Sequence, residues 1–238
     1  DLAVNGQTFR PFLLNLEAFS QWAYDPSRFN GAAFYESWTS HYFGAAAAPF
    51  AVASMKRLDA AQFNRTGYVR NLSEIKGLIG YLGDSEVTTP NGSFKATYNN
   101  TLAPELQQRL REVNAAYEAA QSGLAQAKEH EDFYYDYVYL PALMYNQLLE
   151  FESTLLEAAA RKNAYAAGHR QKDLEAAKKL LKKSSAQLSD IYKTCRQGDR
   201  NEKWKTWYYP EKRRPNNGFP TQEMLHAIQD NLQTLSAR

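Results

Sequence analysis

One short segment, rich in aromatic and basic residues, holds the side chains of this chain that are best suited to binding a ligand. Residues 204–220, WKTWYYPEKRRPNNGFP, place two tryptophans and two tyrosines among lysines, arginines and three prolines. Aromatic rings stack on the faces of sugars and arginine pairs with a uronate carboxylate, although the same residue types also bind single-stranded nucleic acid. The candidate carbohydrate- or partner-binding residues are Trp207, Tyr208, Tyr209, Arg213 and Arg214.

The same segment has a purely structural interpretation. Its prolines exclude a continuous helix, so the chain must cross the surface in extended or turn conformations. Trp204 and Trp207 would then anchor the segment by packing against helices, which is the interpretation that we favour for these two rings. We expect Arg213 and Arg214 to stay exposed.

The other candidate metal ligands and nucleophiles lack the partner residues that a metal site or a catalytic site needs. Glu223 and His226 form a single Glu-x-x-His pair, whereas di-metal helical bundles use two such pairs and two further carboxylates. Cys195 falls in an apolar stripe and suits a small buried side chain better than a nucleophile. The sequence contains no nucleophile-elbow, zinc-protease or phosphate-loop motif. We therefore predict no catalytic residue, no metal site and no cofactor.

The acidic residues suggest no catalytic pair. Glycoside hydrolysis normally needs two carboxylates about 5 to 10 Å apart in a cleft. We expect the acids of this chain to be spread along solvated helix faces, because their spacing along the sequence indicates no convergent pair. The chain alone is therefore predicted not to be catalytic.

Heptad spacing in two segments predicts the long helices that must position these groups. Apolar residues recur in alternating steps of three and four over residues 106–127 and again over residues 174–195. Residues 131–168 predict a third long helix between them, with a kink at Pro141. A final helix begins at Gln222. The pattern predicts an all-α fold, a bundle with three long antiparallel helices in an up-down-up order.

The N-terminal third predicts shorter helices. Asn30 is a good N-cap for a helix that ends at Gly44. Asn71 and Glu74 have the spacing of a capping box before another short helix. A Pro-Asn-Gly triplet between β-forming residues predicts a small hairpin near residues 86–98.

Composition limits the classes of partner. A chain of 238 residues with 44% hydrophobic and 23% charged residues can bury a sizeable core. A formal charge of +2 gives no strong case for nucleic acid, and no apolar run is long enough for a membrane span. Cys195 is the single cysteine, so an intrachain disulfide is excluded.

Several stretches together resemble a known family. RPFLLNLEAFSQWAYDPSRF (residues 10–29) and FYESWTSHYFG (residues 34–44) resemble the junction in glycoside hydrolase family 115, the xylan α-glucuronidases, where a catalytic (β/α)-barrel leads into a helical domain. DFYYDYVYLPA (residues 132–142) resembles that family's Asp-aromatic-Tyr…Pro segment. The positions in register are Asp132, Tyr135, Val138 and Pro141. The family's His-Ile-Gly-Tyr stretch is not recognisable in residues 206–220.

The resemblance implies a function for the parent protein. Residues 1–29 would be the junction from an upstream catalytic barrel, and residues 30–238 would form the helical bundle domain. The parent would be a secreted or periplasmic glycoside hydrolase that degrades plant polysaccharide such as xylan, with its catalytic carboxylates in the barrel. This domain would brace the barrel, shape the substrate cleft or form a homodimer interface. The alternative is an autonomous carbohydrate- or protein-binding helical module without catalysis; neither nucleic acid nor membrane is an expected partner.

Overall fold

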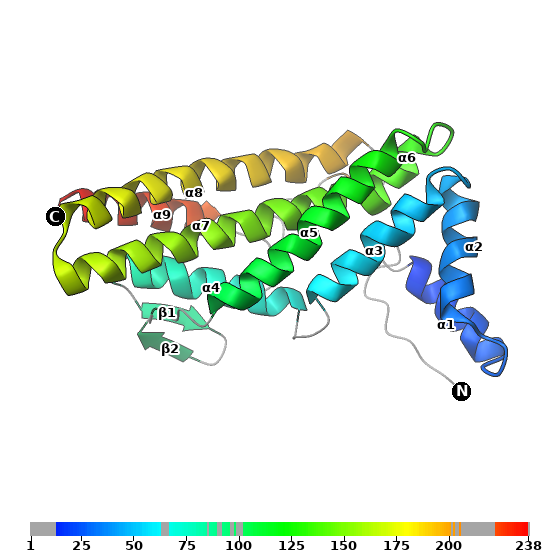
Figure 1. Cartoon of the computed structure of the whole chain (residues 1–238), viewed down its shortest axis with the longest axis horizontal. Helices are drawn as coiled ribbons and strands as arrows, with labels where there is room; N and C mark the ends of the chain where they lie inside the picture. Colours follow the sequence, from blue (N-terminus) through cyan, green and yellow to red (C-terminus); the bar gives the residue numbers. More distant parts are fainter. Residues whose placement is uncertain are drawn as a thin grey trace.

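The protein has the all-α fold that its sequence predicts. The computed structural model describes residues 13–62, 67–84, 86–89, 92–95, 98, 102–200, 202, 205 and 222–237. Three long helical segments run up, down and up along the long axis of the molecule (Figure 1). The first is α5 (Leu102–Leu124) and the third is α8 (Gln171–Gln197). The second is continuous and consists of α6 (Glu131–Tyr134), the π-helical turn η1 (Tyr135–Tyr139) and α7 (Leu140–Gly168).

The predicted apolar stripes face the interior of this bundle. All seven stripe positions of α8, from Leu174 to Cys195, are buried. On α5 the stripe alternates between buried and half-buried residues. In α7 the buried residues include Asn146, Leu149, Phe151, Glu152 and Thr154. Because successive helical residues lie 100° apart, these positions place protein around most of the circumference of α7.

The sequence predicts a kink at Pro141, and the structure has a π-helical turn, η1, just before this residue. The N–H of Leu140 donates to the carbonyl of Tyr135, five residues earlier, in place of the usual four. A proline has no N–H and its ring crowds the preceding turn of a regular α-helix. A wider turn before Pro141 is consistent with both constraints, and such turns occur mostly as single insertions inside α-helices.

Four shorter helices precede α5. They are α1 (Leu13–Tyr24), α2 (Gly31–Phe43), α3 (Ala48–Gln62) and α4 (Gly67–Leu82). The predicted cap of α2 is confirmed, since the side-chain oxygen of Asn30 accepts from the N–H groups of Ala32 and Ala33. Gly44 follows the helix with a φ of 83°, a conformation that favours glycine.

The capping box predicted at Asn71 is wrong. Helix α4 begins at Gly67, so Asn71 lies inside it. The carboxylate of Glu74, also inside the helix, lies 3.7 Å from the guanidinium of Arg109 in α5. A tertiary ion pair has therefore replaced the local contact that the sequence pattern indicates.

The predicted hairpin and the predicted last helix are both present. Strands β1 (Glu86–Thr89) and β2 (Gly92–Lys95) pair antiparallel after α4. Helix α9 (Gln222–Ser236) packs against α8 and α4. On the inner face of α9, Asn231 donates a hydrogen bond from its side-chain amide to the carbonyl of Ile79 in α4.

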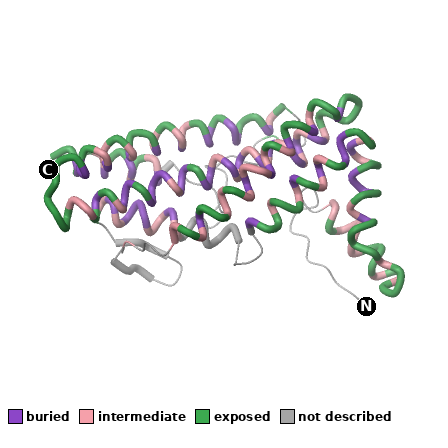
Figure 2. Tube along the Cα trace, viewed as in Figure 1, coloured by how far each residue is buried: buried purple, intermediate pink, exposed green. Residues whose placement is uncertain are grey.

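Two apolar clusters hold the helices together. The larger cluster joins α4, α5, α7, α8 and α9. The smaller one is rich in aromatic rings and joins α2, α3, the C-terminal part of α5 and the α6–η1 segment. In it the ring of Trp38 packs edge-on to Phe43, and Phe43 packs edge-on to Tyr134. Figure 2 shows that buried residues run along the whole bundle and continue into α2.

A close contact of α5 with Tyr134 and with α3 predicts a measurable effect on stability. A Cβ at Gly123 in α5 would lie 2.0 Å from the hydroxyl of Tyr134 and 2.7 Å from Cβ of Phe50 in α3. We expect Gly123→Ala to lower the free energy of unfolding by roughly 1–3 kcal/mol, as overpacking of a core does. Urea denaturation measures this change.

Gly77→Ala in α4 is the matched control. Among the described residues, no atom beyond the adjacent helix backbone lies within 4 Å of a Cβ built there. Alanine favours a helix over glycine by up to about 1 kcal/mol, so this variant should be neutral or more stable. Equal losses in both variants would contradict a specific close contact at Gly123.

Candidate functional site

The aromatic and basic residues singled out from the sequence are not tested by the structure. Trp207, Tyr208, Tyr209, Arg213 and Arg214, together with the anchor Trp204, lie outside the described residues. Glu223 and His226 lie on the exposed side of α9. The described part of the chain directs attention to a different place, where α3, α4, α5 and α7 meet.

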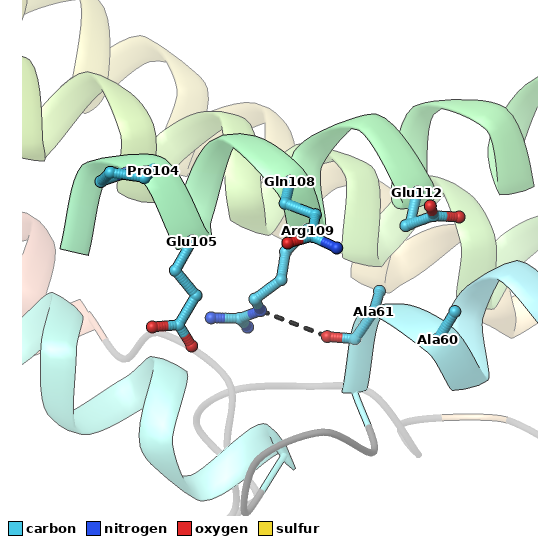
Figure 3. Close-up of a pocket in the computed structure, with 7 residues that line it drawn as sticks. All are labelled: Ala60, Ala61, Pro104, Glu105, Gln108, Arg109 and Glu112. Carbon is cyan, nitrogen blue, oxygen red and sulfur yellow. Dashed lines mark hydrogen bonds between the residues drawn. The ribbon is translucent and has the colours of Figure 1, made fainter.

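A pocket of about 560 Å³ lies between the end of α3 and the start of α5 (Figure 3). In Figure 3 the side chains of Glu105 and Arg109 both extend from α5 toward α4. The lining residues are Ala60, Ala61, Pro104, Glu105, Gln108, Arg109 and Glu112. At the edge of the pocket Glu112 of α5 forms an ion pair with Arg57 of α3 at 2.8 Å.

Arg109 links three helices at the inner wall of this pocket. Its Nε donates to the carbonyl of Ala61 at 3.2 Å, near the C-terminal end of α3. Its Nη1 lies 3.7 Å from Oε2 of Glu74 in α4, and both side chains are largely buried. A guanidinium suits this position because its fixed fork of donors can meet a backbone carbonyl and a carboxylate at once.

Glu152 of α7 completes the buried cluster. It is 1% exposed, and its carboxyl group is hydrogen-bonded to that of Glu74. Burial, followed by the hydrogen bond and the negative charge of Glu74, holds the pKa of Glu152 well above its ordinary value, against a smaller opposing effect of Arg109. Two ionised carboxylates have no proton to share, so the hydrogen bond requires that one of the pair be protonated.

The surroundings favour the protonated pair. Glu105 adds a third carboxyl group whose charge also raises the pKa of Glu152, while Arg109 is the cation that acts against it among the described groups. Burial also raises the pKa of the Tyr145 hydroxyl, so this neighbour of Arg109 stays neutral. One retained proton thus reduces the excess of negative charge that burial of these side chains would otherwise produce.

The cluster corrects the expectation that the acids lie along solvated helix faces. Glu74 and Glu152 are brought together although 78 positions separate them in the sequence. The sequence feature that could have predicted burial of Glu152 is its position in an apolar stripe. It follows Leu148 by four residues and precedes Leu155 by three. The pair does not match a glycosidase, because carboxyl groups in hydrogen-bond contact leave no room for a glycosidic bond between them.

A second feature lies at the end of the molecule remote from the C-terminus, where α1 and α2 stand across the long helices (Figure 1). We call the apolar side chains of α1 that do not pack against the aromatic cluster the α1 surface: Leu16, Phe19, Trp22 and Tyr24. None of the twelve residues of α1, all of them described, is buried. Trp22 is 41% exposed and Tyr24 is 93% exposed.

Two tyrosines attach α1 to the rest of the protein. The hydroxyl of Tyr137 accepts a hydrogen bond from the N–H of Leu13 at 3.0 Å. The hydroxyl of Tyr42 in α2 donates to the carboxylate of Glu17 at 2.6 Å. Leu13, Leu14 and Ala18 also pack against the aromatic cluster, so one side of the helix is covered while Trp22 and Tyr24 remain exposed.

Metal and membrane sites receive no support from the described ranges. Within them no group of three His, Cys, Asp or Glu side chains is placed to hold a metal ion. No described helix combines the length and the apolar character that a bilayer crossing demands. Comparisons with protein-family models, with curated proteins and with solved structures find no match to this chain.

The buried pair predicts a pH dependence of stability. Because the pKa of Glu152 is higher in the folded protein than its unfolded value near 4.3, its contribution is complete at acidic pH and is lost as pH rises through the folded pKa. In Glu152→Gln the amide can donate to Glu74 without titrating. Relative to wild type, this variant should gain about 1.4 kcal/mol at high pH for each unit by which the pKa is raised. Urea denaturation between about pH 4 and pH 9 measures it.

Glu157→Gln is the matched control, since Glu157 is an exposed residue of the same helix. Its stability should follow wild type across the pH range. If the Glu152 and Glu157 variants gave the same pH profile, the shared proton would be refuted.

Proposed function

We propose that this chain is a helical accessory domain of a polysaccharide-degrading glycoside hydrolase of the α-glucuronidase type. Its role is to pack through the α1 surface against the catalytic barrel of the same protein. The observation that carries the proposal is the exposure of the α1 surface. The resemblance to the barrel–helical junction of glycoside hydrolase family 115 covers residues 10–29, the segment that contains this helix.

The exposed surface has the physical properties of an interface. Trp22 and Tyr24 are large aromatic side chains, a type that is enriched where proteins meet. Each Å² of apolar surface removed from water stabilises a complex by roughly 25 cal/mol before the costs of association. The exposed rings of Trp22 and Tyr24 therefore favour a partner that covers them.

The acidic cluster supports a role outside the chemistry of hydrolysis. Glu74 and Glu152 share a buried contact and act together as a structural element between α4 and α7. In this proposal the catalytic carboxylates belong to the barrel, the substrate is plant polysaccharide such as glucuronoxylan, and the protein works in a secreted or periplasmic setting. A homodimer through the same surface is a second arrangement that the experiment below separates.

Binding to a barrel domain is the direct test. The complete open reading frame should encode a (β/α)-barrel directly upstream, which can be produced separately and titrated with this chain by calorimetry. We expect Trp22→Asp to weaken the complex at least tenfold, because it places a charge in an apolar contact, a loss of about 1.4 kcal/mol or more. The chain by itself should release no glucuronic acid from glucuronoxylan fragments.

Lys172→Asp is the control for this titration. It introduces the same residue at an exposed position near the start of α8, at the opposite end of the bundle from α1 (Figure 1). It should leave the affinity for the barrel unchanged. An open reading frame without a barrel, or equal affinities for the two variants, would overturn the proposal, and self-association of the chain that Trp22→Asp alone abolishes would assign the α1 surface to a homodimer.

A further inference from the structure

Helix α4 is attached to α7 at two points of different chemistry. Near the middle of α4, the carboxyl group of Glu74 is hydrogen-bonded to that of Glu152. Near its end, Nζ of Lys162 donates to the carbonyls of Tyr81 and Leu82 at 2.6 and 3.2 Å. Glu152 and Lys162 are 1% and 5% exposed, so both attachments lie inside the protein.

The attachment near the middle depends on one proton. The groups that act on Glu152 from the helices packed against it are Glu74 of α4 and Glu105 and Arg109 of α5, and the Tyr145 hydroxyl beside Arg109 stays neutral. Once the proton has left, three carboxylates meet one guanidinium among the described groups, and like charges at such short range repel. The contact that joins the two helices then becomes a repulsion.

The attachment at the end of α4 is supported by a contact that does not titrate. Asn231 of α9 donates from its side-chain amide to the carbonyl of Ile79 at 2.7 Å. Neither an amide nor a backbone carbonyl gains or loses a proton over the pH range in which proteins are folded. The ammonium group of Lys162 also pairs with the carboxylate of Asp84, just beyond the helix. We therefore expect this end of α4 to stay in place when the middle is released.

The pocket between α3 and α5 brings solvent close to the carboxyl pair. Glu105 and Arg109 both line this pocket of about 560 Å³. The guanidinium of Arg109 lies 3.7 Å from Oε2 of Glu74, so the pair lies directly behind the inner wall of the pocket. The proton that the pair holds thus has a short path to water.

We propose that the Glu74–Glu152 contact is a pH-sensitive switch that controls how closely α4 lies against α7. While the pair holds its proton, α4 is closed. When the proton passes to solvent, the helix opens around Glu74 and turns on its C-terminal end, which Lys162 and Asn231 hold. Opening uncovers Ile75, which is 0% exposed in the closed form, and extends the pocket toward α7. The switch requires no contact with a barrel, so it is independent of the proposed function.

The direction of the switch follows from the linkage between proton binding and opening. In the open form the carboxyl groups are in water, where a glutamate has a pKa near 4.3. In the closed form the pKa of Glu152 is well above its ordinary value, because of burial and the neighbouring carboxyl groups. The open fraction therefore rises by up to about tenfold for each pH unit between these two pKa values and is constant above the higher one.

Thiol labelling measures the opening. Ile75→Cys places a thiol beside Glu74, and Leu82→Cys places one at the end that Lys162 holds; both positions are 0% exposed. Labelling by iodoacetamide is followed by peptide mass spectrometry and divided by the rate for the unfolded chain at the same pH. Between about pH 5 and pH 9 this ratio should rise at least tenfold for Ile75→Cys and by less than about twofold for Leu82→Cys.

Two second substitutions separate the switch from other effects of pH. Adding Glu152→Gln to Ile75→Cys removes the titrating group, while the amide can still donate to Glu74, so the ratio should no longer depend on pH. Adding Glu157→Gln, an exposed residue of the same helix, should leave the rise intact. Native Cys195 of α8, 1% exposed, reports unfolding of the whole bundle in the same molecules and should show no rise.

The outcomes that would overturn the switch are distinct. A constant ratio for Ile75→Cys, or a rise that survives Glu152→Gln, would refute control by the carboxyl pair. Equal rises for Ile75→Cys and Leu82→Cys would refute the hinge, and an equal rise at Cys195 would show that the bundle unfolds as a whole. If circular dichroism at pH 5 shows that Ile75→Cys does not fold, Leu78→Cys, 3% exposed on the same face, replaces it.

Discussion

The burial of α7 on most of its circumference is the constraint on which the rest of the structure depends. Polar side chains at the buried positions of α7 have no access to solvent, so they need partners inside the protein. Asn146 donates to Asn114 of α5. Lys162, 5% exposed, donates from Nζ to the carbonyls of Tyr81 and Leu82 at the C-terminal end of α4.

These contacts determine how α4 lies on the bundle. Glu152 meets Glu74 in the middle of α4, and Lys162 meets its last carbonyls about seven residues further on. The ammonium group is favourable there because the end of a helix carries partial negative charge and unsatisfied carbonyls. Arg109 extends the same network to α3. Polar side chains of α5 and α7 thus hold α3 and α4 in place beside the pocket.

Local patterns predicted the parts of the fold that depend on a single segment. The stripes of α5 and α8, the cap at Asn30 and the hairpin after α4 each follow from residues close in sequence. The acidic cluster did not follow, because it joins residues from different helices and because Glu74 suited a local capping box equally well. The exposure of Trp22 likewise depends on what the other helices cover, which no pattern within α1 reveals.

Amide hydrogen exchange, followed by mass spectrometry across a pH series, tests the central claim that buried polar contacts of α7 hold α4 in place. After correction for intrinsic rates, peptides from α4 should lose protection as pH rises and Glu152 gives up its proton. Peptides from α8, which is held by an apolar stripe, should keep theirs over the same range. Loss of protection in α4 and α8 together, or constant protection in α4, would contradict this account.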